Sequence, residues 1–390
     1  MNTRFVSRGA RLRALALAGT AAAALVLAGC SSGGDAPGDE TDAGDAGGSP
    51  EASALETKVA GFLQPLDAYE MPSEAIADGA ALEGKTIHYI PITIQAPQFA
   101  LTAKVLEEAT ASVGAKLQVC NGDGTPSTIS QCIDGAVNDA NVGTIILDGF
   151  FIGMAANSVM AAQAAGIDVI SSNQNVMPDF PASDTLGYVV SPGTDMFVEV
   201  ASWISLDSGG AGNQLVLVSQ DGPIQQAFVE AGMAEVEADC PDCTISMLEV
   251  SSANFGQVSS DLGAKLLQDP NIEYVHAQFA QYLPVVIPAV ASTGQKIGTG
   301  AATLGALQAV AGGQVAAASG QSATFGSWAL IDTALRMAND QEVFEYVIPT
   351  RLFTADNIGD VTLTEEAEAS GEWYGPTTFA DDFKKLWGAA

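Results

Sequence analysis

Cysteine and histidine are the residue types in this chain best suited to metal binding or redox chemistry, and their placement favours disulfides. An even number of cysteines remains once Cys30 is set apart, which suits an oxidising compartment. Four cysteines allow three pairings, of which we predict Cys120–Cys132 and Cys240–Cys243. A zinc site is the alternative, but the only histidines, His88 and His276, fall inside strand-like runs. No metal site is therefore predicted.

No group of residues in the sequence points to catalysis. A nucleophile of the Gly-x-Ser-x-Gly type is absent, and with both histidines in strands nothing supplies an activated nucleophile. No nucleotide cradle is expected either. Carboxylates can still meet in space, so a hydrolase stays as a less favoured alternative. We predict that the protein is not an enzyme and uses no cofactor.

Short apolar runs alternate with amphipathic segments from Gly84 onward, which predicts parallel sheets covered by helices on both faces. The first series of strands is expected at 85–94, 116–119, 144–147, 168–171 and 188–190. A second series follows a helix at 196–206, with strands at 214–218, 244–250, 274–277, 296–299 and 315–319. A long helix at 323–339 and a mixed tail finish the chain. Its 390 residues suit two domains, so the predicted fold class is α/β with two doubly wound lobes.

The N-terminus has the pattern of an export signal. Four arginines and no acid accompany an apolar run from Leu15 to Ala28 that is short for a bilayer span. The run ends in Leu27-Ala28-Gly29-Cys30, which resembles the lipobox of bacterial lipoproteins. The alternatives are an ordinary signal peptide and a lone membrane helix. The resemblance implies a signal peptide at 1–29 and a lipid on Cys30 that holds the chain at the outer face of the cell membrane.

The segment after Cys30 is acidic and poor in large apolar side chains. We expect residues 30–54 to form a disordered tether, followed by an extension at 55–83. The whole chain has 46 acidic and 14 basic residues, and loss of residues 1–29 removes four of the arginines. Such a surface repels nucleic acid and anionic headgroups, so no nucleic acid partner is expected. The simplest interpretation of the acidity is a well-solvated surface.

Several segments resemble the type I periplasmic binding proteins of the ribose- and galactose-binding kind. Residues 116–147 follow that family's second strand, helix and third strand. Residues 164–170 resemble its A-x-x-G-I-P-V run through Gly166, Ile167 and Val169, with Asp168 in place of proline, and 269–278 match its run around the h-P-d-i-d segment. Gly326 and the helix after it fit the last crossover. The order and spacing of these segments carry the resemblance, since no one of them is specific.

The resemblance implies two parallel-sheet lobes joined by a three-crossing hinge, with a ligand held between them. The crossings are expected near Ser191, Gly320 and Tyr346. Ligands in such sheets lie beyond the carboxyl ends of the strands. The expected division is 84–190 plus 321–345 for lobe 1, and 191–320 plus 346–390 for lobe 2.

When the family's ligand-binding positions are transferred to this sequence one at a time, the family's charged side chains are missing from the resulting site. Gln98 and Phe99 stand for the family's aromatic pair, and Asn173 and Gln174 stand for its Asp-Arg pair. The family's Asn-Asp pair becomes Phe279 and Ala280, and its arginine near the second lobe's first helix has no counterpart. An anionic ligand would lack a cationic clamp, although helix N-termini can still bind an anion.

Polar and aromatic side chains that follow the predicted strands form the candidate ligand site. Rings offer stacking faces, amides donate and accept, and aspartates bind hydroxyl or amine groups. Each has a structural alternative: core packing for three of the phenylalanines, turn formation for the asparagines, and loop capping for the aspartates. The candidates are Gln98, Phe99, Asp148, Phe150, Asn173, Gln174, Asp221, Asn254, Phe255, Phe279 and Gln321.

The function implied by the resemblance is transport. We expect a monomeric lipoprotein that captures a small neutral solute, sugar-like or more apolar and aromatic, for an ABC permease and ATPase. We expect the protein to contact the membrane only through the lipid on Cys30. A sensor that presents its ligand to a membrane kinase would use the same two-lobed site and is the first alternative.

Overall fold

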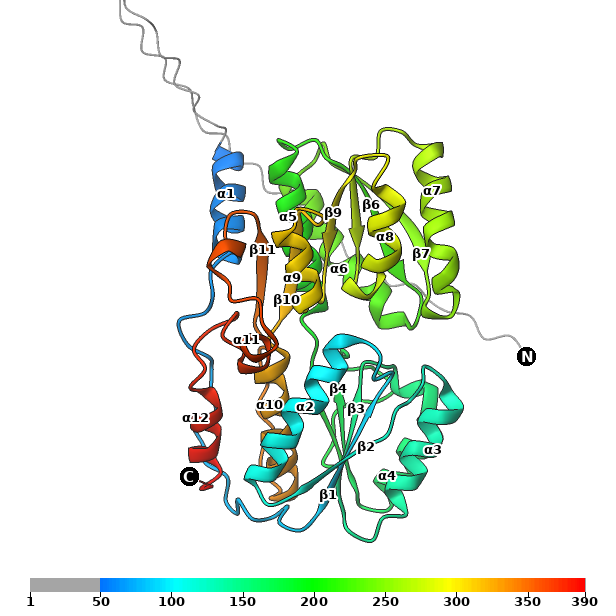
Figure 1. Cartoon of the computed structure of the whole chain (residues 1–390). Helices are drawn as coiled ribbons and strands as arrows, with labels where there is room; N and C mark the ends of the chain where they lie inside the picture. Colours follow the sequence, from blue (N-terminus) through cyan, green and yellow to red (C-terminus); the bar gives the residue numbers. More distant parts are fainter. Residues whose placement is uncertain (1–49, 390) are drawn as a thin grey trace, which may run out of the picture. The chain divides into compact units, whose positions relative to one another are not determined.

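The computed structural model describes residues 50–389. Within them, two sheets are each covered by helices (Figure 1), which confirms the predicted fold class. The predicted signal peptide, the lipidation site Cys30 and most of the predicted tether lie outside the described residues. In the part that is described, no helix combines the length and apolar character needed to span a bilayer.

The first lobe is built on a five-stranded parallel sheet with the order β2-β1-β3-β4-β5. From β1 the chain goes outward to β2 and then returns to β3 on the other side of β1. This reversal makes the carboxyl ends of β1 and β3 a topological switch point, where ligands bind in open α/β sheets. The strands are β1 (Thr86–Pro91), β2 (Lys116–Val119), β3 (Val142–Asp148), β4 (Asp168–Ser172) and β5 (Leu186–Val189).

Helices of the first lobe begin at residues that favour helix starts. The Thr125 hydroxyl caps α3 by accepting from the Thr128 amide, and Pro126 follows it at the first helical position. Ser322 caps α10 in the same way through the Phe325 amide. These helices are α2 (Pro97–Ser112), α3 (Pro126–Val137), η1 (Ile152–Ala155), α4 (Ala156–Ala164) and α10 (Ala323–Ala338).

The second lobe has a six-stranded sheet with the order β11-β10-β9-β8-β6-β7, in which only β11 is antiparallel to its neighbour. Its switch point lies between β6 and β8. The strands are β6 (Asn213–Ser219), β7 (Thr244–Val250), β8 (Tyr274–Ala277), β9 (Lys296–Thr299), β10 (Ala317–Gln321) and β11 (Thr350–Thr354). The helices are α5 (Gly193–Asp207), α6 (Pro223–Asp239), η2 (Ser252–Gln257), α7 (Val258–Gln268), η3 (Ala280–Tyr282), α8 (Leu283–Val290), α9 (Leu304–Ala311) and η4 (Ile358–Asp360).

The three expected crossings occur between β5 and α5, between β10 and α10, and between α10 and β11. Segments at the two ends of the described chain connect the lobes again. Helix α1 (Pro50–Phe62) packs on α5 and β11 of the second lobe, and the residues after it reach the first lobe. Residues 50–54 of the predicted tether are therefore helical, because Leu55 and Val59 of the same helix bury their side chains.

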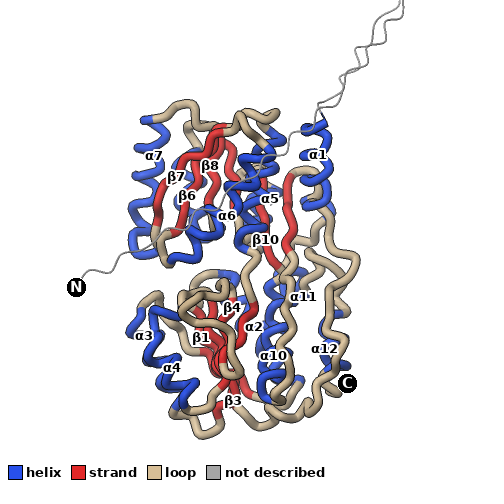
Figure 2. Tube along the Cα trace, turned by 180° about the vertical axis from the view of Figure 1, so that it is seen from behind, coloured by secondary structure: helices blue, strands red, loops and turns tan. Residues whose placement is uncertain are grey.

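The C-terminal tail departs from its expected place in the second lobe. After α11 (Glu365–Ser370), helix α12 (Phe379–Leu386) lies beside α10 of the first lobe (Figure 2). Phe383 and Trp387 stack there against Trp328. Burial of these rings outweighs the sequence proximity to β11, so assigning all of 346–390 to lobe 2 is wrong for this helix.

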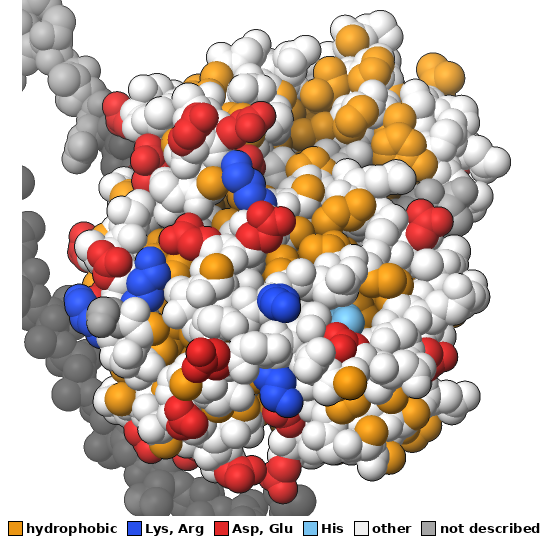
Figure 3. All heavy atoms as spheres, turned by 60° about the horizontal axis from the view of Figure 1, so that its bottom comes forward, with side chains coloured by type: hydrophobic (Ala, Val, Ile, Leu, Met, Phe, Trp, Pro, Cys, Tyr) orange, Lys and Arg blue, Asp and Glu red, His pale blue; other side chains and the backbone are white. Residues whose placement is uncertain are grey.

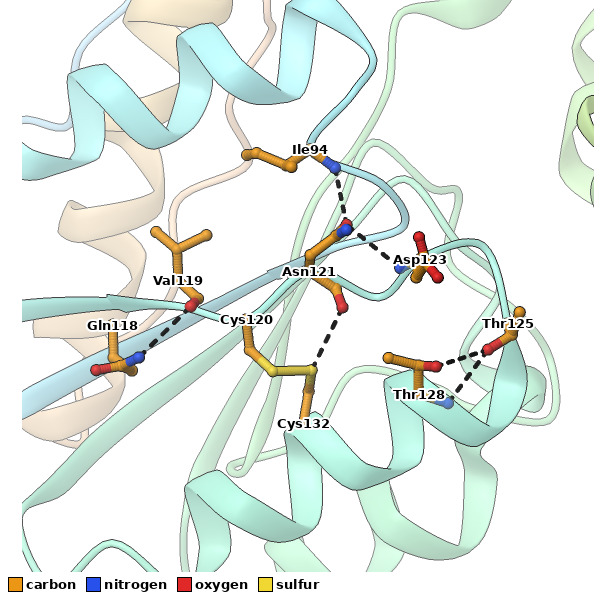
Figure 4. Close-up of a disulfide and its surroundings, with 9 residues drawn as sticks. All are labelled: Ile94, Gln118, Val119, Cys120, Asn121, Asp123, Thr125, Thr128 and Cys132. Carbon is orange, nitrogen blue, oxygen red and sulfur yellow. Dashed lines mark hydrogen bonds between the residues drawn. A yellow bond between two sulfur atoms is a disulfide. The ribbon is translucent and has the colours of Figure 1, made fainter.

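Both predicted disulfides are confirmed, and one of them supports the end of the first sheet. Cys120 and Cys132 connect the residue after β2 to α3 (Figure 4). Asn121 follows Cys120 in the sequence, and its side-chain oxygen accepts hydrogen bonds from the backbone amides of Ile94 and Asp123. The loop that follows β1 is thereby tied to the loop that follows β2.

Candidate functional site

Phe99 lies at the switch point of the first lobe. It stands in the first turn of α2, and its ring rests on the backbone of Gly149, the residue directly after β3. A Cβ at Gly149 would lie 2.3 Å from the Phe99 Cζ atom, and the φ angle of +77° also favours glycine there. The half-buried ring therefore presents an apolar surface beside the carboxyl end of β3.

Asp148 is the last residue of β3 and its side chain is fully buried. Its carboxylate accepts from the Tyr89 hydroxyl at 2.6 Å and from the Asn173 side-chain amide at 2.7 Å. Burial raises the pKa of Asp148, and the hydrogen bonds from Tyr89 and Asn173 oppose that rise. The predicted ligand residue Asp148 is thus occupied by protein donors.

Asn173 connects Asp148 to two glutamines. Its backbone is left-handed, with φ of +56°, a conformation that asparagine tolerates better than most residues. The Gln174 side-chain amide donates to its backbone oxygen and the Gln321 side-chain amide donates to its Oδ1, both at 2.7 Å. The Gln321 bond joins the end of β4 in the first lobe to the end of β10 in the second.

Phe150 packs in the core of the first lobe, with 1 % of its side chain exposed. Its ring is surrounded by core residues, so it lies outside the candidate site. The neighbouring Phe151 lies close to the second lobe, since a Cβ on Gly222 would lie 3.9 Å from the Phe151 Cβ, while its ring packs over Gly153 of its own lobe. Phe151 also meets Phe180 edge to face. Two adjacent phenylalanines after a strand signal an aromatic contact, but the turn at Gly149 decides which one is inside.

Candidates in the second lobe are less closely grouped. Beside the candidate Asp221, the buried Gln278 side chain is hydrogen-bonded at both polar atoms: its Oε1 accepts from the Ser219 amide and its Nε2 donates to the Gln225 backbone oxygen. Asp221 accepts from the Ser219 hydroxyl. These bonds join the ends of β6 and β8, the switch point of this lobe.

The remaining second-lobe candidates lie against structural neighbours or in solvent. Phe255 stacks on Tyr282 at 6.1 Å between ring centroids, and Phe279 packs against the same core cluster. Asn254 is exposed. The core alternative is therefore the better interpretation for Phe255 and Phe279.

Two recesses meet at Gln321. The space between the lining atoms is about 300 Å³ in one and about 270 Å³ in the other with open solvent included, and the centre of a water molecule can occupy only about 10 Å³ of each. Gln98 and the C-terminal residues Glu368 and Tyr374 line the first. Asn173 lines the second together with residues of α10. Sequence reasoning missed the tail residues because nothing local links them to the strand ends.

The recess linings contain no basic residue. Both arginines of the described chain are engaged elsewhere: Arg336 pairs with Asp332 at 2.6 Å, and Arg351 donates to the backbone oxygens of Leu63 and Trp373. On the face seen in Figure 3, acidic side chains are dispersed and basic ones are few. An anionic guest would find no cationic partner in these recesses.

Neither histidine is placed for catalysis or metal binding. His276 is buried in β8 with its ring stacked on Phe197, and burial lowers its pKa to about 3. His88 contacts Asp139 near the opposite end of the first sheet. Among residues 50–389, no cluster of three or more potential metal ligands occurs.

Residues 79–86 read Gly-Ala-Ala-Leu-Glu-Gly-Lys-Thr, which matches the sequence pattern of a phosphate-binding loop although no nucleotide cradle was expected. Such a loop must follow a strand and open a helix, where its amides point at the phosphates. Here the segment leads into β1, and Gly79 lies against the Trp387 backbone. The pattern therefore has no phosphate-binding geometry in this chain.

The whole arrangement is closely similar to solved structures of solute-binding proteins. A 5-methylthioribose transporter solute-binding protein from Thermotoga lettingae aligns with a TM-score of 0.67 at 12 % identity, covering 79 % of this chain and all of that one. The chain has the type I periplasmic binding protein fold. A Mycobacterium smegmatis structure in complex with beta-D-fucofuranose aligns at 0.63 and 17 % identity, covering 75 % of this chain and 98 % of that chain.

A third protein of the type I fold, a carbohydrate transporter from Acidothermus cellulolyticus in complex with myo-inositol, is 22 % identical with a TM-score of 0.60. That match covers 73 % of this chain and 98 % of the other. No protein-family model and no curated protein matches the sequence. At these identities the likeness establishes the type I fold and leaves the ligand to be argued from the site.

Proposed function

We propose that the chain is an extracytoplasmic, non-enzymatic solute-binding protein of an ABC importer that captures a small uncharged solute between its lobes. The observation that carries this proposal is the joining of the strand ends of both lobes by the Asn173–Gln321 hydrogen bond, beside recesses without a basic residue. The three similar structures described above are complexes with 5-methylthioribose, beta-D-fucofuranose and myo-inositol, which are sugars or a polyol.

The same proposal covers anchoring and partners. Cys30 would carry the lipid at the outer face of the cell membrane, and a permease with its ATPase would receive the solute from a monomer. The acidic, dispersed surface supports a soluble body held near the membrane only by its N-terminus.

A thermal-shift screen of the chain lacking residues 1–29 tests the function. A neutral solute from a panel of pentoses, hexoses, polyols and planar heterocycles should raise the melting temperature in a saturable way, because a ligand that binds only the folded state stabilises it. Amino acids and phosphorylated sugars should have no effect. Tight binding of a phosphorylated sugar, or conversion of the solute into product, would contradict the proposal.

Phe99→Ala should weaken binding of the stabilising solute at least about tenfold, because the ring supplies stacking area at the switch point. The melting temperature of the empty protein should fall only slightly, since the ring is only partly buried. Phe344→Ala removes another half-buried ring, one that packs on Tyr346 away from the recesses, and is the matched control. Equal affinities in both variants would remove Phe99 from the site. Isothermal titration calorimetry makes the comparison.

A further inference from the structure

The side chains from Asp148 to Gln321 form a chain of hydrogen bonds with a defined direction. The Asp148 Oδ1 atom accepts from the Asn173 Nδ2 atom, so the Asn173 Oδ1 atom points the other way. There it accepts from the Gln321 Nε2 atom. A carboxylate cannot donate, and this fixes which end of each amide is which.

The Gln321 Oε1 atom, at the end of this chain of hydrogen bonds, has no hydrogen-bond partner among the described residues. Gln321 is 7 % exposed, lines both recesses, and its Oε1 atom is buried without a hydrogen-bond donor among the described residues. The Oε1 atoms of Gln174 and Gln225 are also buried without a donor. A buried oxygen left without a donor costs about 1 to 3 kcal/mol, which a bound molecule with an O–H or N–H group would recover.

We propose that Asp148 and Asn173 are positioning residues that turn the carbonyl oxygen of Gln321 toward the recesses, and that the solute donates an O–H or N–H hydrogen bond to it. This inference rests on the proposed function and deepens it, because it states what the uncharged solute must carry. Gln321 is the residue that touches the solute. Asp148 and Asn173 have no free polar atom directed toward it.

The orientation of the Gln321 side-chain amide can be measured without any solute. In protein labelled with ¹⁵N on asparagine and glutamine side chains, the Gln321 NH₂ protons should exchange slowly with solvent, because they are held by Asn173. Asn173→Gly removes the acceptor while keeping the left-handed backbone, and should speed this exchange at least tenfold. The signal is assigned by its loss in Gln321→Leu.

Asn138→Gly, at the C-terminal end of α3, is the control and should leave the Gln321 exchange rate unchanged. Equal exchange rates in wild type and Asn173→Gly would overturn the positioning role of Asn173.

The donor requirement is tested with D-ribose, myo-inositol and their monodeoxyfluoro analogues, in which fluorine replaces a hydroxyl and cannot donate. For the parent that binds, at least one analogue should bind wild type at least tenfold more weakly and Gln321→Leu less than threefold more weakly. Equal binding of parent and every analogue to wild type would overturn the donor requirement. If neither parent nor any neutral panel solute binds, the proposed function fails, whereas the exchange measurement still decides the orientation of Gln321.

Discussion

Asp332→Asn should lower the free energy of unfolding by about 3 to 5 kcal/mol, because it leaves the buried Arg336 guanidinium without its partner. The Asp332 carboxylate is fully buried in α10 and accepts from Arg336 and from the Tyr346 hydroxyl, each at 2.6 Å. Its second oxygen accepts from the Trp387 indole at 2.8 Å. Arg336 in turn donates to the Glu74 backbone oxygen.

One carboxylate therefore holds α10, the third crossing and the C-terminal helix, and through Arg336 also the N-terminal segment. Urea unfolding followed by circular dichroism gives the change in free energy. Asp382→Asn, which removes an exposed partner of Lys385, is the matched control and should change stability by less than about 1 kcal/mol. Similar losses in the free energy of unfolding for both variants would show that the buried Asp332 carboxylate contributes no more than an exposed one.

Glu199→Gln should stabilise the protein by about 3 kcal/mol above neutral pH and have little effect below pH 4. Glu199 lies in α5, 4 % exposed, and accepts from the hydroxyls of Ser319 in β10 and Thr350 in β11. Burial raises its pKa from 4.5 to about 7, the two hydroxyls oppose this, and Asp195 adds to the rise.

The sign of the pH effect follows from proton binding. Between pH 4.5 and 7 the folded state holds a proton on Glu199 that the unfolded state has released. Stability therefore falls as the pH rises through this window, and above it the full cost of the buried charge remains. Glutamine removes that cost and can still meet both hydroxyls. Melting temperatures of wild type and Glu199→Gln from pH 4 to 8.5 measure the difference, with the exposed Glu230→Gln as control. Parallel curves would contradict the assignment.

The sequence alone was enough to predict the fold class and most of the strands between residues 84 and 321. Strands predicted at 116–119, 274–277 and 296–299 coincide with β2, β8 and β9, and the helix predicted at 323–339 matches α10 to within one residue. Apolar runs and helical periodicity are local properties of the sequence, so they can be recognised without knowledge of the tertiary contacts. Both disulfides were predicted for the same reason, because each pair is close in sequence.

Tertiary structure alone decided which strand-end residues face open space. Phe150 and Phe151 are adjacent and chemically identical, and the left-handed turn at Gly149 sends the first into the core. Asp148 was predicted to meet a ligand, but it is surrounded by donors from β1 and the end of β4. The tail could be read from sequence as part of the second lobe. Burial of Phe383 and Trp387 places the last helix of the tail on the first lobe. The free energy of apolar burial depends on surfaces that meet only in the folded chain, so it cannot be read from the local sequence.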